Sequence, residues 1–75
     1  MKSEIINDIN KEIERVDGGK YGRPYASFHE FYGVLCEEVD EVWDEIKQKS
    51  PDTEKVYSEL VQVVSVCYRM MRDLK

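Results

Sequence analysis

The sequence has few of the residues that mark secreted, zinc-binding or membrane proteins. Its 75 residues include two cysteines and a single histidine. Cys36 and Cys67 fall inside predicted helices, so we expect buried, reduced thiols and no disulfide framework. A lone histidine without a paired cysteine motif gives no zinc site. No secretory leader is visible, and no apolar run approaches the roughly 18 residues of a membrane span, so we expect a cytoplasmic protein with no membrane partner.

An excess of basic residues is also missing. Eleven lysines and arginines oppose 16 aspartates and glutamates, which gives a net charge of −5. A protein that coats a nucleic-acid polymer needs a basic stripe that displaces counterions, so we exclude this class of partner. A nucleotide ligand is compatible with the charge, because a bound metal can neutralise phosphates. The glycines of segment 18–22 lack the spacing and the preceding strand of a phosphate-binding loop.

Three amphipathic helices are predicted, and no strand pattern competes with them. They cover about residues 3–16, 27–49 and 51–74, with apolar side chains at three- and four-residue spacing. The sequence therefore predicts an all-α fold in one domain, residues 1–75, built as a three-helix protomer.

Capping residues mark the helix starts. Ser3 can cap the first helix, and Ser27 with Glu30 has the capping-box spacing at the second. Ser50 and Pro51 fit the N-cap and the first position of the third helix.

The third predicted helix is apolar over about half of its circumference, which is typical of a helix buried against two neighbours. A chain of 75 residues is near the lower limit for a self-sufficient core. With only two other helices available, we expect a second subunit to cover part of this surface. The helical bundle would then be completed by self-association to a dimer or tetramer.

The strongest chemical signal is a group of carboxylates on two helices. Glu38 and Glu37 lie three and four residues before Glu41 on the second helix, and Glu59 opens an otherwise apolar run on the third. If both helices turn these acids toward one another, they form an oxygen-rich site suited to Mg²⁺. The alternative is a solvated acidic face, which is the ordinary role of acids opposite an apolar stripe.

These residues resemble the signature of a known family. Glu37-Glu38-x-x-Glu41, followed after a spacer by Glu59-x-x-Gln62, is similar to the paired acidic motifs of MazG-like all-α nucleoside triphosphate pyrophosphohydrolases. The resemblance covers the second and third predicted helices. It implies a helical dimer or tetramer that uses Mg²⁺, or Mn²⁺, to cleave nucleoside triphosphates to a monophosphate and pyrophosphate. It also implies metal ligands at Glu38, Glu41, Glu59 and Gln62, with Glu37 and Glu38 as catalytic residues and Glu37 as an additional acid or water-orienting group.

Gln62 departs from the family pattern, which has aspartate at the fourth position. A glutamine oxygen can coordinate a hard cation, but it brings no negative charge and cannot act as a general base. The alternative function is therefore a non-catalytic oligomerisation or regulatory module that keeps the MazG-like fold with a degenerate metal site.

Four further residues are candidates for substrate binding. Lys20 and Arg23 could approach phosphates, although isolated basic residues are usually solvated. His29 could contact substrate or simply pack near the start of its helix. Trp43 could stack on a base or take part in core or subunit packing.

Overall fold

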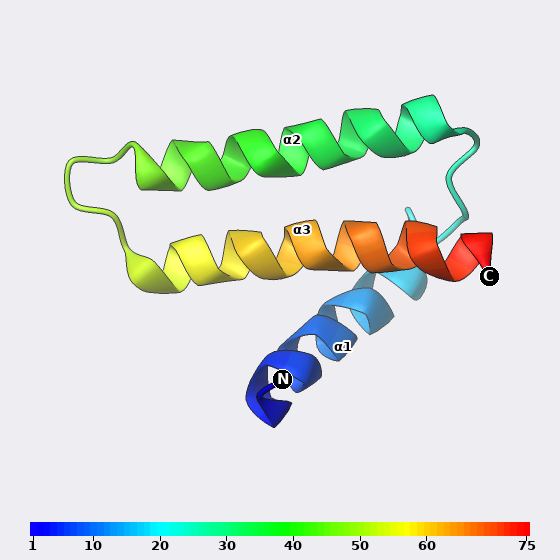
Figure 1. Cartoon of the computed structure of the whole chain (residues 1–75), viewed down its shortest axis with the longest axis horizontal. Coiled ribbons are helices and arrows are strands. Elements are labelled where there is room, and N and C mark those ends of the chain that lie inside the picture. Colours follow the sequence, from blue (N-terminus) through cyan, green and yellow to red (C-terminus); the bar gives the residue numbers. More distant parts are fainter.

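The structure, a computed structural model, describes all 75 residues and contains three α-helices and no strand. The helices are α1 (Ser3–Asp17), α2 (Phe28–Ile46) and α3 (Thr53–Leu74). α2 and α3 lie side by side and antiparallel, while α1 crosses α3 obliquely near the C-terminal half of α3 (Figure 1). None of the helices combines the length and the apolar character that crossing a membrane requires. The all-α, three-helix prediction is confirmed.

The start of α2 follows the predicted capping pattern. The Ser27 hydroxyl accepts a hydrogen bond from the Glu30 backbone N–H at 3.0 Å. The Glu30 carboxylate reaches back to the backbone N–H of Ala26, also at 3.0 Å, one residue earlier than in a standard capping box. α1 differs from the prediction, because Lys2 is its N-cap residue and Ser3 already lies inside the helix, with no side-chain cap.

The turn between α2 and α3 is longer than predicted. α2 ends at Ile46, and α3 begins at Thr53 with Asp52 as its N-cap residue. Asp52 replaces Ser50 in this role because its carboxylate accepts the backbone N–H groups of the first turn, at 2.9 Å for the shorter bond. Ser50 precedes a proline, and that position disfavours helical backbone, so neither helix extends through it.

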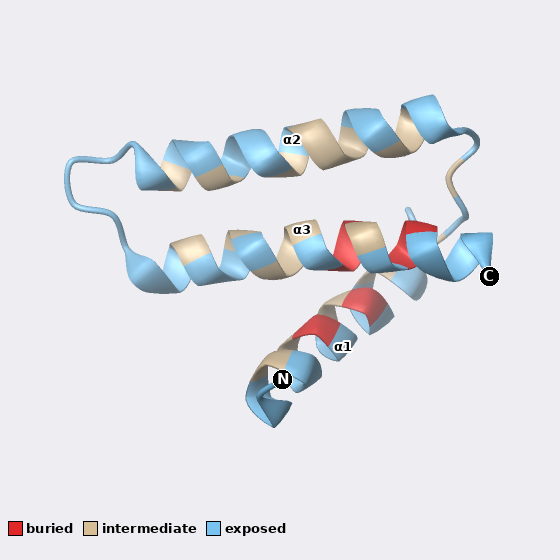
Figure 2. Cartoon of the chain, viewed as in Figure 1, coloured by how far each residue is buried: buried red, intermediate tan, exposed pale blue.

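The core is small and lies where α1 crosses α3. Its buried apolar residues are Ile9 and Ile13 from α1 with Val66 and Met70 from α3. α2 contributes no fully buried residue (Figure 2). Cys36 and Cys67 are free thiols but are only half-buried, so the expectation of full burial was wrong. The reason is that both lie beside a surface that no element of the chain covers.

That surface, called here the apolar face, is formed by exposed uncharged side chains of α2 and α3. On α3, Val64 lies about 200° around the helix from the buried Val66, so the apolar face points away from the core. Trp43 on α2 is 59% exposed. The apolar face consists of Phe28, Tyr32, Val39, Trp43 and Ile46 of α2 and Leu60, Val64, Tyr68 and Met71 of α3.

Candidate functional site

Three of the predicted acidic residues converge between α2 and α3. Glu38 and Glu41 lie three positions apart on α2, and Glu59 faces them from the antiparallel α3. One carboxylate oxygen from each lies within 4.8 Å of the other two. The structure thus places these three acids together, without Glu37, and we call the three residues the acidic cluster.

The acidic cluster is electrostatically unsatisfied within the protomer. The Oε2 atoms of Glu38 and Glu59 are buried and have no hydrogen-bond partner. Burial, followed by the negative charges of Glu41 and Glu59, raises the pKa of Glu38 from 4.5 to about 7. Burial and the neighbouring Glu41 also raise the pKa of Glu59. Near neutral pH, uptake of a proton or a cation would therefore stabilise the cluster by reducing the repulsion among its carboxylates.

The donor atoms of the cluster fit a hard divalent cation. All three are carboxylate oxygens, which Mg²⁺ and Mn²⁺ prefer as ligands. The two unpartnered Oε2 atoms have no hydrogen bond to lose when a cation binds. Gln62 lies one turn beyond Glu59 on α3 and is half-buried, whereas Glu37 is exposed on α2.

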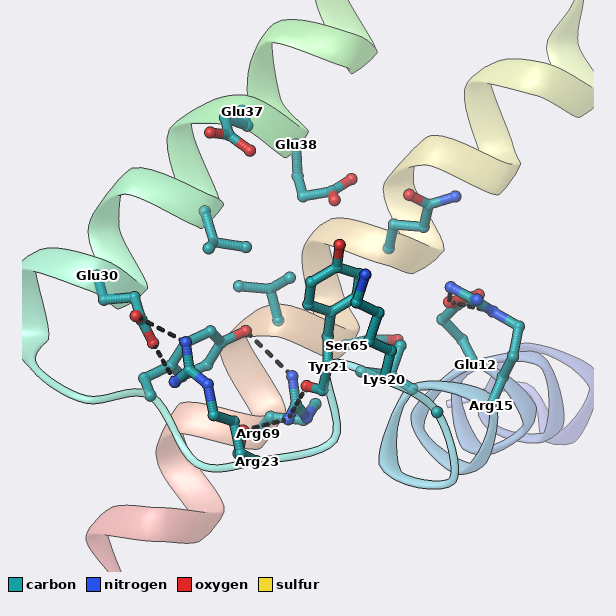
Figure 3. Close-up of a pocket in the computed structure, with 16 residues that line it drawn as sticks. Glu12, Arg15, Lys20, Tyr21, Arg23, Glu30, Glu37, Glu38, Ser65 and Arg69 are labelled. Carbon is teal, nitrogen blue, oxygen red and sulfur yellow. Dashed lines mark hydrogen bonds and ion pairs between the residues drawn. The ribbon is translucent and has the colours of Figure 1, made fainter.

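A cavity of about 560 Å³ adjoins the acidic cluster. It exists because α1 and α2 both pack on α3 but do not contact each other. Its remaining wall is the segment 18–27 that joins α1 to α2, which we call the strap. Glu38 belongs to the cluster and also lines the cavity, with Glu37 close by (Figure 3). Gln62 is a further lining residue. The cluster and the cavity therefore form one continuous site.

Charges around the cavity are mostly neutralised in pairs. Lys20 is the one cation of the lining that forms no ion pair, and its ammonium group lies 5.7 Å from the centroid of the Tyr21 ring. Glu37 and Glu38 are lining acids without a basic partner. The pairs are Arg15 with Glu12, Arg23 with Glu30, and Arg69 with Asp17 just outside the lining.

The structure separates the four predicted substrate-binding residues into two groups. Lys20 and Arg23 lie on the strap and line the cavity. The Arg23 guanidinium is held by the Glu30 carboxylate through two hydrogen bonds, at 2.7 and 3.0 Å. His29 and Trp43 do not line the cavity, because His29 is exposed in the first turn of α2 and Trp43 lies on the apolar face.

Two arginines of the site were not singled out from the sequence. Arg15 lines the cavity from α1, and Arg69 lines it from α3. Arg69 is only 5% exposed, which is unusual for a charged residue. The sequence contained a signal, since Arg69 lies directly before Met70 and three residues after Val66, inside the apolar arc of its helix. An arginine at such a position needs internal hydrogen-bond partners.

Comparison with known proteins gave no match, whether with protein-family models, with curated proteins or with solved structures.

Proposed function

We propose that the protein is a Mg²⁺-dependent nucleotide pyrophosphohydrolase that cleaves nucleoside triphosphates to a monophosphate and pyrophosphate. The observation that carries the proposal is the convergence of Glu38, Glu41 and Glu59 beside a cavity. This cavity is lined by Lys20, which forms no ion pair. The similarity of the acidic motif to that of the MazG-like family supports it. Free thiols agree with a cytoplasmic location, where cysteines stay reduced.

Glu38, Glu41 and Glu59 would hold the cation, Mg²⁺ or Mn²⁺, with Gln62 as a fourth oxygen donor. When bound, the cation neutralises phosphate charge and lowers the pKa of water. The bound cation would stabilise Glu38 and Glu59 most, because each has a buried oxygen that lacks a hydrogen-bond partner within the chain.

The substrate would occupy the cavity, whose volume of about 560 Å³ is in the range of small-molecule sites. Lys20 attracts the phosphate chain, because its charge is not already neutralised by a carboxylate. Glu37 is exposed at the cavity and is suited to accept the proton of the attacking water. The new bond joins the water oxygen to the α-phosphorus, and the bond from that phosphorus to the bridging oxygen breaks, releasing pyrophosphate.

A second candidate function is a non-catalytic regulatory or oligomerisation module. It is favoured by Gln62, which lines the cavity beside Glu38 but supplies neither a charge nor a proton acceptor. Such a module would bind a cation or nucleotide without releasing pyrophosphate.

We further propose that two copies of the chain associate through the apolar face. A compact monomer of 8.9 kDa exposes about 4,800 Å², by the usual dependence of surface on mass, whereas this chain exposes 5874 Å². The difference of about 1,000 Å² is comparable with the roughly 800 Å² that each partner buries in a standard interface. The apolar face carries no charge, so two identical copies can meet without like-charge repulsion.

The test of the enzymatic function is pyrophosphate release from a panel of nucleoside triphosphates with Mg²⁺. We expect release by the wild type, and loss of release in Glu41→Ala and Glu59→Ala. Asp40→Ala is the matched control, because Asp40 is an exposed acid of α2 outside the cluster. Mg²⁺ binding without pyrophosphate release would favour the module. If Mg²⁺ and Mn²⁺ both leave the thermal midpoint unchanged, the metal site itself is wrong, since a ligand of the folded state stabilises it.

A further inference from the structure

We propose that Arg69 is a positioning residue, which holds the strap on α3 and thereby keeps Lys20 and Arg23 beside the cavity. The role for substrate binding rests on the proposed function, whereas the hold on the strap can be measured independently of it. The inference starts from burial, because Arg69 is 5% exposed and an arginine is rarely buried without several partners.

The guanidinium of Arg69 contacts the strap at three residues. Its Nη2 donates to the backbone carbonyls of Tyr21 and Arg23, at 3.3 and 3.0 Å. Its Nη1 donates to the Tyr25 hydroxyl at 3.4 Å, and its central carbon lies 5.2 Å from the centroid of the Tyr25 ring. Its Nε donates to the carboxylate of Asp17, the last residue of α1, at 3.3 Å. One side chain of α3 thus contacts the last residue of α1 and three residues of the strap, of which Figure 3 labels Tyr21 and Arg23.

No other hydrogen bond or ion pair joins the strap to α3. The backbone hydrogen bonds of its first half run only among residues 14–22, within the end of α1 and the turn that follows it. At its other end, Glu30 of α2 holds Arg23 and the backbone N–H of Ala26. The carbonyls of Tyr21 and Arg23 therefore depend on Arg69 for an internal donor.

This arrangement bears directly on the site. Lys20 precedes one of the carbonyls that Arg69 holds, and Arg23 carries the other. The side chain of Arg23 is fixed by Glu30, while its backbone is fixed by Arg69. Lysine cannot replace this group, because a single ammonium lacks the planar fork that reaches several acceptors at once.

The test compares Arg69→Lys and Arg69→Gln with the wild type. Arg69→Lys retains the charge and the apolar stem, so it keeps the buried site filled if Arg69→Gln does not fold. Arg72→Gln is the matched control, because Arg72 pairs with the same Asp17 carboxylate, at 2.8 Å, but contacts no strap residue. Two quantities are measured: the rate of trypsin cleavage at the Lys20–Tyr21 bond, and the Kd for inorganic pyrophosphate in the presence of Mg²⁺. The bond after Arg23 is followed by Pro24 and resists trypsin, so cleavage reports on one strap position.

We expect both Arg69 variants to increase the cleavage rate and the Kd by about tenfold or more, since hydrogen bonds from a charged donor are among the stronger ones. Arg72→Gln should change either quantity by less than about twofold, as expected for an exposed ion pair. Unchanged cleavage in Arg69→Lys would overturn the hold on the strap. Faster cleavage with an unchanged Kd would overturn the positioning role. If the wild type itself binds no pyrophosphate, the proposed function fails, and the positioning role fails with it, whatever the cleavage rates show.

Discussion

Replacing Glu38 by glutamine is expected to stabilise the metal-free protein above neutral pH while removing its stabilisation by Mg²⁺. The pKa of Glu38 rises from 4.5 to about 7 because the carboxyl is partly buried beside Glu41 and Glu59. Between these values the folded state holds a proton that the unfolded chain has released. The free energy of unfolding therefore falls as the pH rises from about 4.5 to about 7, and stays lower above that range. Glutamine does not ionise and escapes this loss.

The size of the effect follows from the same pKa. At about 1.4 kcal/mol per pKa unit, the full difference corresponds to about 3 kcal/mol at high pH. Glu38 is only partly buried, and solvent screening reduces this to about 1–2 kcal/mol. In a domain of this size, 1 kcal/mol changes the thermal midpoint by about 4–8 °C, so we expect an increase of about 4–16 °C.

The assay is thermal unfolding followed by circular dichroism at about pH 5 and about pH 8, at one protein concentration. Each sample is measured with a chelator and with excess Mg²⁺. Glu37→Gln is the matched control, because it removes the same charge from the adjacent, exposed position outside the cluster. With chelator at about pH 8, the thermal midpoint of Glu38→Gln should exceed that of the wild type. At about pH 5 the difference between the two midpoints should be much smaller. Its response to Mg²⁺ should be lost.

Two results would refute this reasoning. If Glu38→Gln is no more stable than the wild type with chelator at about pH 8, the buried carboxylate does not destabilise the fold. If Mg²⁺ raises its midpoint as much as that of the wild type, Glu38 is not a ligand.

Three further changes have defined outcomes. Gln62→Asp is expected to tighten Mg²⁺ binding, measured by calorimetry, and to increase pyrophosphate release. The reason is that it places a charged oxygen next to the acidic cluster. Weaker Mg²⁺ binding would exclude this position from the metal site. Trp43→Lys should convert dimers to monomers in sedimentation equilibrium, because it places a charge on the apolar face. Asp40→Lys, on another side of α2, is the control and should leave the association state unchanged. Asp52→Ala should lower the free energy of unfolding in urea by about 1 kcal/mol, because it removes the N-cap of α3; no change would show that water replaces the cap.

The prediction from sequence was accurate where local patterns decide the outcome. Apolar spacing gave the three helices, and Ser27 marked the start of α2 because its side chain acts within its own turn. The end of α2 and the start of α3 were placed less well. Ser50 and Asp52 are both good N-cap residues, and only the backbone conformation around Pro51 selects the second.

For the site, spacing along one helix placed Glu38 and Glu41 on a common side of α2, and Glu59 was singled out because it opens an apolar run. The distances among the three could not be read from spacing, because they depend on the relative shift and rotation of two antiparallel helices. The cavity was also not predictable. It arises because α1 packs on α3 and not on α2, and because Arg69 contacts strap residues far away in the sequence.

The sequence by itself determined that the chain is all-α and acidic. It also determined which acids share a helix face, since helix periodicity is a property of the local backbone. Only the tertiary structure decided that two carboxylate oxygens are buried without partners, that the pKa of Glu38 is raised to about 7, and that Arg69 donates hydrogen bonds to two strap carbonyls. These are properties of contacts between helices, and such contacts are set by packing geometry that no single segment contains.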